Sequence, residues 1–208
     1  ESYIKFVLKQ IPDWEENAAK TYGMTDAIQV PVNTDGDRAM MVEYSRWYPF
    51  QYWNAGASWM LLPIYEFWQC YGNRTVEYNG EQLDLEKDIL LPLLTKQANF
   101  WEQICTPEYF TDVNGNAKYE EGKTELLPGE RYLIIPSYSP ENYPLGDYTS
   151  TITANSTMDI SAARDGLRMT IEMEKVFKAD GYEERIAKWE SLMKLLPEYE
   201  YDESGALC

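Results

Sequence analysis

The sequence predicts a mainly α-helical protein with one small β-hairpin region near residues 106–140. Three observations support this prediction. Apolar side chains recur every three or four residues along several stretches, which is the period of an amphipathic helix. Proline or glycine stands at the ends of these stretches and leaves short turns between them. One region, residues 106–155, lacks the helical period and carries turn-forming and strand-forming residues instead.

The first expected helix covers residues 3–22 and ends before Gly23, a typical helix stop. A proline fits the first turn of a helix but disturbs a helix interior. Two helical pieces joined at Pro12 are therefore predicted. The apolar positions that carry the helical spacing are Ile4, Val7, Leu8, Ile11, Trp14 and Ala18.

The next two stretches differ in their apolar pattern. Residues 52–71 are apolar nearly all round, which predicts a helix buried on most faces that ends at Gly72. Residues 84–105 are predicted as two pieces, 85–91 and 92–105, because Pro92 cannot lie in a helix interior without a kink.

The last two helices are expected at residues 157–180 and 182–196. Ser156 and Asp159 resemble a capping box at the start of the first, and Gly181 separates the two. Pro197 follows the end of the second.

The non-helical region is predicted to form a hairpin that turns near Asn114 and Gly115, with residues 132–138 as a strand. Asp112 opens a run that begins like a calcium-binding EF-hand loop. Ala117 and Lys123 stand where that loop needs glycine and glutamate, so the hairpin turn is the better interpretation.

The charge and composition exclude several classes of function. The chain has 208 residues, with 35 acidic and 18 basic side chains and a net charge of −17, which argues against nucleic acid or an anionic membrane as a partner. No stretch reaches the roughly 18 apolar residues of a membrane span. The sequence has no histidine, so acid–base chemistry falls to carboxylates, tyrosine or lysine. Neither a metal nor a cofactor is indicated.

The three cysteines are an odd number without a C-x-x-C pair, so neither a disulfide framework nor a metal site is predicted. Cys70 and Cys105 are expected to be buried apolar residues. The chain starts at Glu1 without methionine or a basic leader, as though cut from a longer polypeptide.

Glu141 is the sharpest candidate for acid–base chemistry. It lies between Pro140 and Asn142 in a turn that follows an apolar strand, where aromatic walls would raise the pKa of its carboxyl. The alternative is a solvated loop glutamate, which composition alone favours.

Aromatic residues are abundant, at 14% of the chain, and gather in residues 47–53. Aromatic faces stack on sugar rings, but core packing accounts for most aromatic residues in proteins. Both interpretations of Trp53 and its neighbours stay open at this point.

Seven runs of the chain, in the same order and spacing, resemble glycoside hydrolase family 95. They are PDWEENAAKTYGM (12–24), VNTD (32–35), WNAGASW (53–59), LPLL (91–94), SYSPEN (137–142), TMD (157–159) and LLP (195–197). The resemblance implies an (α/α)6-barrel catalytic domain. Twelve helices and their connections need on the order of 300 residues or more. Residues 1–208 are therefore expected to be a fragment of a single helical-barrel domain, about half of it.

The same resemblance implies an inverting, exo-acting α-L-fucosidase or related α-L-glycosidase with Glu141 as general acid. Trp53, Asn33, Asp35 and Asn142 would then line the sugar pocket. An inverting enzyme needs a second carboxylate as base, and the family's segment for it is not found among these residues. The expected partners are a carbohydrate and the remainder of the parent polypeptide, in the periplasm or outside the cell.

One departure from the family leaves an alternative. The family carries histidines near Val32 and in the helix that contains Pro63, and this sequence has none. The sugar would then be fucose, an α-L-galactoside or another glycan. A non-catalytic carbohydrate-binding domain with the same fold is the alternative function.

Overall fold

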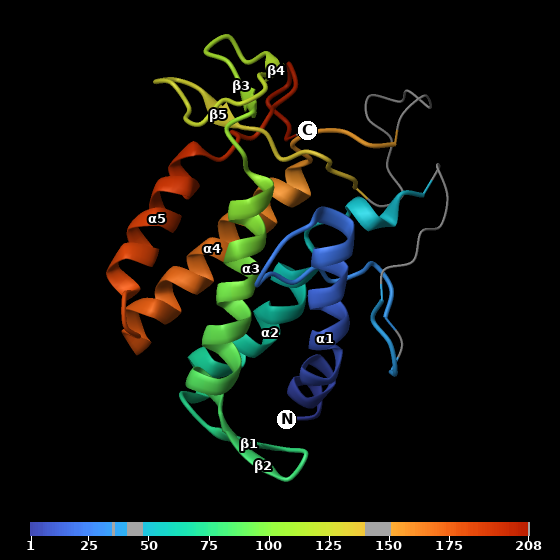
Figure 1. The fold of residues 1–208 in the computed structure, drawn as a ribbon, viewed down its shortest axis with the longest axis vertical. Coiled ribbons are helices and arrows are strands. Elements are labelled where there is room, and N and C mark those ends of the chain that lie inside the picture. The colour runs from blue at the N-terminus through green and yellow to red at the C-terminus, as the bar shows by residue number, and fades with distance from the viewer. Residues whose placement is uncertain (35, 41–47, 140–150, 208) are drawn as a thin grey trace.

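The computed structural model describes residues 1–34, 36–40, 48–139 and 151–207. Helices form its body, and two small antiparallel sheets lie at opposite ends (Figure 1). The helices are α1 (Ser2–Tyr22), α2 (Gly56–Tyr71), α3 (Leu91–Ile104), α4 (Thr157–Phe177) and α5 (Tyr182–Leu195), with a 3-10 turn at Phe50–Tyr52 and a π-helical turn at Leu85–Leu90. The strands are β1 (Thr75–Tyr78), β2 (Glu81–Asp84), β3 (Tyr109–Thr111), β4 (Ala117–Tyr119) and β5 (Arg131–Tyr132). The predicted mainly helical class is confirmed, and the (α/α)6 barrel stays a prediction.

Helix α1 runs unbroken through Pro12, so the predicted break is wrong. A proline in a helix interior costs about 3 kcal/mol. Ile4 and Val7 before the proline and Trp14 and Ala18 after it are all buried. Burial of one large apolar side chain stabilises a fold by roughly 1.5–3 kcal/mol. The apolar side chains on both sides of Pro12 therefore offset its cost, and the helix stays whole.

Helix α2 starts at Gly56, four residues later than predicted, and ends before Gly72 as predicted. The backbone of Val30 passes directly over its first turn, where a side chain at position 56 would meet the Val30 carbonyl oxygen at 2.6 Å. Trp53, just before the helix, has an extended backbone. The residues just before α2 therefore contact other parts of the chain and do not extend the helix.

Helix α4 is central, since it contacts α2, α3 and α5. It begins after Ser156, whose hydroxyl accepts a hydrogen bond from the Asp159 amide at 3.3 Å. The predicted helix at residues 182–196 is confirmed to within one residue. The two predicted pieces of residues 84–105 are a π-helical turn and α3, which follow each other without a gap between Leu90 and Leu91. The helical spacing of apolar residues thus predicts these helices, because the side chains that show this spacing are the ones that form the core.

Three helices meet at Gly166 of α4. A Cβ atom there would lie 2.9 Å from Gln97 Cδ of α3 and 2.9 Å from Ser58 Oγ of α2. Gln97 is fully buried and Ser58 nearly so, so neither side chain has room to move away. This crowding explains a glycine in the middle of a helix.

Replacing Gly166 with alanine is expected to destabilise the protein by about 1–3 kcal/mol, because the extra methyl group overpacks this contact. Chemical denaturation of the full-length protein would measure the change. Gly36→Ala is the control, since no atom lies within 4 Å of a Cβ atom at that glycine. An unchanged or raised stability of Gly166→Ala would contradict the close approach.

The insertion between α3 and α4 forms the predicted hairpin, since β3 pairs with β4 and turns through residues 112–116. The Asp112 carboxylate accepts hydrogen bonds from the backbone amides of Asn114 and Asn116, each at 2.9 Å. The predicted strand at 132–138 is wrong in length, because β5 ends at Tyr132. Pro136 has no backbone N–H group to continue a ladder.

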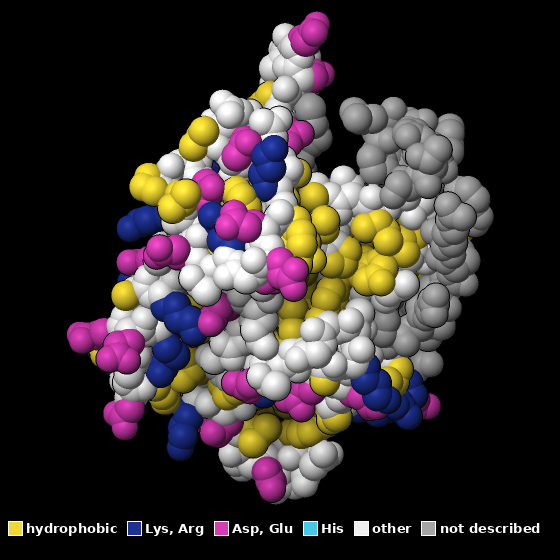
Figure 2. All heavy atoms as spheres, turned by 45° about the horizontal axis from the view of Figure 1, so that its top comes forward, with side chains coloured by type: hydrophobic (Ala, Val, Ile, Leu, Met, Phe, Trp, Pro, Cys, Tyr) yellow, Lys and Arg dark blue, Asp and Glu magenta, His cyan; other side chains and the backbone are white. Residues whose placement is uncertain are grey.

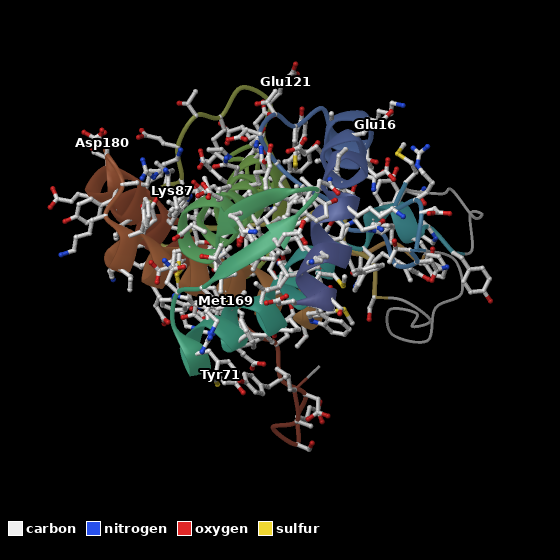
Figure 3. The ribbon with its side chains drawn as sticks, turned by 90° about the horizontal axis from the view of Figure 1, so that it is seen from below. Glu16, Tyr71, Lys87, Glu121, Met169 and Asp180 are labelled. Carbon is white, nitrogen blue, oxygen red and sulfur yellow. The ribbon has the colours of Figure 1, made fainter. Side chains whose placement is uncertain are left out.

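A second hairpin, β1–β2, was not predicted and extends beneath the helices (Figure 3). Its two-residue turn is Asn79–Gly80, with φ of 52° and 83°. An Asn-Gly pair is the strongest short hairpin signal, and the sequence does contain it.

The two internal cysteines differ in burial. Cys105 is buried as predicted, whereas Cys70 is exposed, so that prediction is wrong. Cys70 lies in the last turn of α2 beside Tyr71, which is 60% exposed and points away from the body in Figure 3. This end of α2 extends past the core. Within the described ranges, no helix has the length and apolar content to cross a membrane.

Candidate active site

A buried carboxyl group, that of Asp159, lies in the first turn of α4 and is 0% exposed. Its Oδ2 atom accepts a hydrogen bond from the Ser137 hydroxyl at 2.6 Å and one from the Asn54 amide at 3.0 Å. The sequence predicted Asp159 as part of a capping box with Ser156. Only half of that box forms, because the Asp159 side chain bonds to distant residues instead of to the Ser156 amide.

Asn54 uses all of its side-chain hydrogen-bonding groups. Its Nδ2 atom donates to the Pro136 carbonyl oxygen at 2.9 Å as well as to Asp159, and its Oδ1 atom accepts from the Tyr22 hydroxyl at 2.8 Å. The network therefore joins four parts of the chain: the end of α1, the segment before α2, the segment after β5 and the start of α4.

Burial dominates the electrostatics of this network. It raises the pKa of Asp159 to about 7, although hydrogen bonds from Ser137, Asn54 and Ser156 act to lower it. The Oδ1 atom of Asp159 has no hydrogen-bond partner among the described residues. The pKa of Tyr22 is raised well above its usual value by burial first and by the nearby Asp159 charge second.

The same network contacts the two chain segments that flank residues 140–150, the stretch that contains Glu141. Ser137 and Thr153 exchange two backbone hydrogen bonds, of 2.9 and 2.8 Å. The Asn155 side chain accepts from the Ile134 amide at 2.8 Å. Residues on both sides of 140–150 are thus held together beside α4.

A row of three aromatic rings lies next to Ser137, because it ends at Tyr138. Tyr48 contacts Phe50 with ring centroids 5.9 Å apart, and Phe50 contacts Tyr138 at 5.7 Å. Tyr48 is 46% exposed and Tyr138 is buried, so this aromatic row leads from the surface inward. Figure 2 shows hydrophobic side chains gathered in a recess near the middle of one face. An exposed aromatic ring such as that of Tyr48 can stack on the apolar face of a sugar.

Two of the five predicted site residues lie in the described ranges. Trp53 is 8% exposed and its indole Nε1 lies 3.0 Å from the sulfur of Met158. Its ring packs edge-on against Trp59, with centroids 5.8 Å apart. Most of the Trp53 ring is therefore covered by protein in this structure.

Asn33 is exposed, and the preceding Val32 packs against the apolar cluster that contains Trp53. Asp35, Glu141 and Asn142 lie outside the described residues. Their places in the sugar pocket, and the meeting of Glu141 with Trp53, stay predictions.

Sequence reasoning did not single out Asn54 and Ser137, and it considered Asp159 only as a helix cap. A signal was present, since the three residues lie in three of the conspicuous runs: WNAGASW, SYSPEN and TMD. The fold brings these three runs together at one buried point. Within the described part of the chain, no group of three or more Cys, Asp or Glu residues could hold a metal ion.

The described residues thus form a helical body with a row of aromatic rings and a buried carboxyl network. The sequence matches the glycosyl hydrolase family 95 catalytic domain over residues 1–208. The chain therefore belongs to this family, as its resemblance implied, and the family assigns it to the glycoside hydrolases. No curated protein matches the sequence.

Proposed function

We propose that the chain is part of an inverting, exo-acting α-L-fucosidase, or a related α-L-glycosidase, with Glu141 as its general acid. In this reaction Glu141 donates its proton to the glycosidic oxygen as the bond to the anomeric carbon breaks. A second carboxylate takes a proton from water, which attacks the opposite face of the sugar. Membership of the family indicates a glycoside hydrolase, and it is the strongest support for the proposal.

The assignment of Glu141 is supported by its neighbours. Ser137 and Tyr138 belong to the same six-residue run, and Tyr138 closes the inner end of the aromatic row. A carboxyl against such walls keeps its proton to a higher pH, as a general acid requires. The base would come from the remainder of the parent polypeptide. Trp53, Asn33, Asp35 and Asn142 would contribute to the sugar pocket.

The choice of sugar follows from the family resemblance. The sequence lacks the histidines expected near Val32 and Pro63, and a pocket built to bond one hydroxyl rejects analogues without it. We therefore propose α-L-fucose first and an α-L-galactoside second. Periplasmic or extracellular residence is proposed on the same family grounds.

The stereochemistry of the reaction tests the proposal. Proton NMR of the full-length protein acting on 4-nitrophenyl α-L-fucopyranoside is expected to show β-L-fucose as the first product, before mutarotation. The α-L-galactopyranoside is the parallel substrate for the second sugar. Release of the α-anomer first would contradict the inverting assignment.

The second candidate is a non-catalytic carbohydrate-binding domain with the same fold, for which the aromatic row and the absence of histidine are the supporting observations. Aromatic stacking alone binds sugars without any acid or base. Binding on a glycan array, with no hydrolysis of the bound glycans by the full-length protein, would favour this candidate over the enzyme.

A further inference from the structure

The role of the buried Asp159 carboxyl is not explained by the reaction itself. It is 0% exposed, so it cannot touch a substrate in this arrangement. Burial of a carboxyl group is unfavourable unless hydrogen bonds compensate it. A helix cap does not require it, because Ser156 already caps α4 through its hydroxyl.

One of the two side-chain hydrogen bonds to Asp159 comes from Ser137, in the SYSPEN run. The Ser137 hydroxyl donates to Asp159 Oδ2 at 2.6 Å, and the Ser137 oxygen accepts from the Ser156 amide at 3.1 Å. The backbone of Ser137 is held by its two bonds with Thr153. The side chain of Ser137 is thus fixed to the start of α4, and its backbone is fixed to Thr153, which precedes that helix.

The second arm of the network fixes the segment before α2. Asn54 donates both to Asp159 Oδ2 and to the Pro136 carbonyl oxygen, directly before Ser137. Trp53 contacts Met158, directly before Asp159. Trp53 and Asn54 therefore contact Met158 and Asp159 of α4. Residues 136 and 137 bond to Asn54 and Asp159, respectively.

Glu141 follows Ser137 by only four residues, and four residues span at most about 14 Å. The position of Ser137 therefore limits where the Glu141 carboxyl can lie. General acid catalysis needs that carboxyl within hydrogen-bonding distance of the glycosidic oxygen.

We propose that Asp159 is a positioning residue. Its Oδ2 atom accepts hydrogen bonds from the Ser137 hydroxyl and the Asn54 amide, and so fixes Ser137, four residues before the general acid. This inference rests on the proposed role of Glu141. Asp159 exchanges no proton with the substrate. It acts by holding Ser137 against Asn54 and α4.

The experiment compares two substrates of the full-length protein, methyl and 4-nitrophenyl α-L-fucopyranoside. Methoxide is a poor leaving group and depends on the general acid, whereas 4-nitrophenolate leaves with little help. Asp159→Ala is expected to lower kcat for the methyl glycoside by about 10–100-fold, the effect of a misplaced catalytic group. The loss for the nitrophenyl glycoside should be several-fold smaller. A purely structural role would lower both by the same factor.

Two further variants sharpen the result. Asp159→Asn keeps a neutral oxygen acceptor in place of Oδ2 and is expected to restore most of the methyl-glycoside activity. Ser137→Ala removes the hydroxyl that donates to Asp159 and accepts from the Ser156 amide, and leaves the Asn54–Asp159 bond in place. It is expected to show the same substrate-dependent loss, but a smaller one. It carries the test if Asp159→Ala does not fold. Thr170→Val is the control in α4, since the Thr170 hydroxyl is equally buried and bonds to the Leu94 carbonyl oxygen at 3.0 Å, away from the network.

Glu141→Gln separates this inference from the proposed function. If Glu141→Gln shows a strong leaving-group dependence but Asp159→Ala and Ser137→Ala lower both substrates equally, or neither, the positioning role is overturned and the general acid stands. If Glu141→Gln shows no such dependence, the proposed function fails first, whatever the Asp159 variants do.

Discussion

Replacing Glu141 with glutamine in the full-length protein is expected to lower kcat for methyl α-L-fucopyranoside by about 10²–10⁴-fold, the usual contribution of a general acid. Glutamine has nearly the same shape as glutamate but has no proton to give to the departing oxygen. The loss for 4-nitrophenyl α-L-fucopyranoside should be much smaller, since that leaving group needs no proton. The KM values should change little, because the ground-state complex keeps its contacts.

A matched control separates the chemistry from the loss of one negative charge. Glu121 is an exposed glutamate at the edge of the molecule (Figure 3), and Glu121→Gln is expected to leave both rates unchanged. The pH profile is a second measurement, since loss of the acid should remove the alkaline limb of the kcat curve. Full activity of Glu141→Gln on the methyl glycoside would show that another group supplies the proton.

The helical part of the fold could be predicted because its signals are local. The Ser156 cap and the apolar period give the start and face of α4, and both act within a few residues. The errors have tertiary causes. Pro12 remains inside α1 because residues on both sides of it reach the core, and the segment before Gly56 stays non-helical because Asn54 bonds to other parts of the chain.

The candidate site was predictable only in part for the same reason. Asp159 lies 22 residues from Ser137 and 105 residues from Asn54 in the sequence, so no local pattern connects them. Glu141 is a candidate because its own neighbours resemble a family run, and it stays a prediction. Asp159 also lies in such a run, but the run does not indicate which distant residues its carboxyl bonds to, and the fold shows these partners.

Stability should depend on pH through Asp159, and Asp159→Asn is expected to remove that dependence. Burial raises the pKa of Asp159 from 3.8 to about 7. The unfolded chain therefore loses its proton near pH 4, while the folded protein keeps it up to pH 7. Between these values, each unit of pH favours the unfolded state by about 1.4 kcal/mol. The stability that protonated Asp159 contributes is complete below pH 4 and lost as the pH rises to 7.

The variant should therefore gain stability relative to the wild type as the pH rises from 4 to 7, by up to about 4 kcal/mol, and no further above pH 7. Denaturant unfolding of both full-length proteins at several pH values would measure this difference. Asp112→Asn provides a control whose stability difference from the wild type should change only below about pH 4, with the opposite sign. Backbone amides of the hairpin turn lower the pKa of Asp112, so its stabilising effect is present at neutral pH and lost on acidification. A stability difference between Asp159→Asn and the wild type that stays constant from pH 4 to 8 would mean that Asp159 titrates alike in the folded and unfolded states, contrary to its burial in the network.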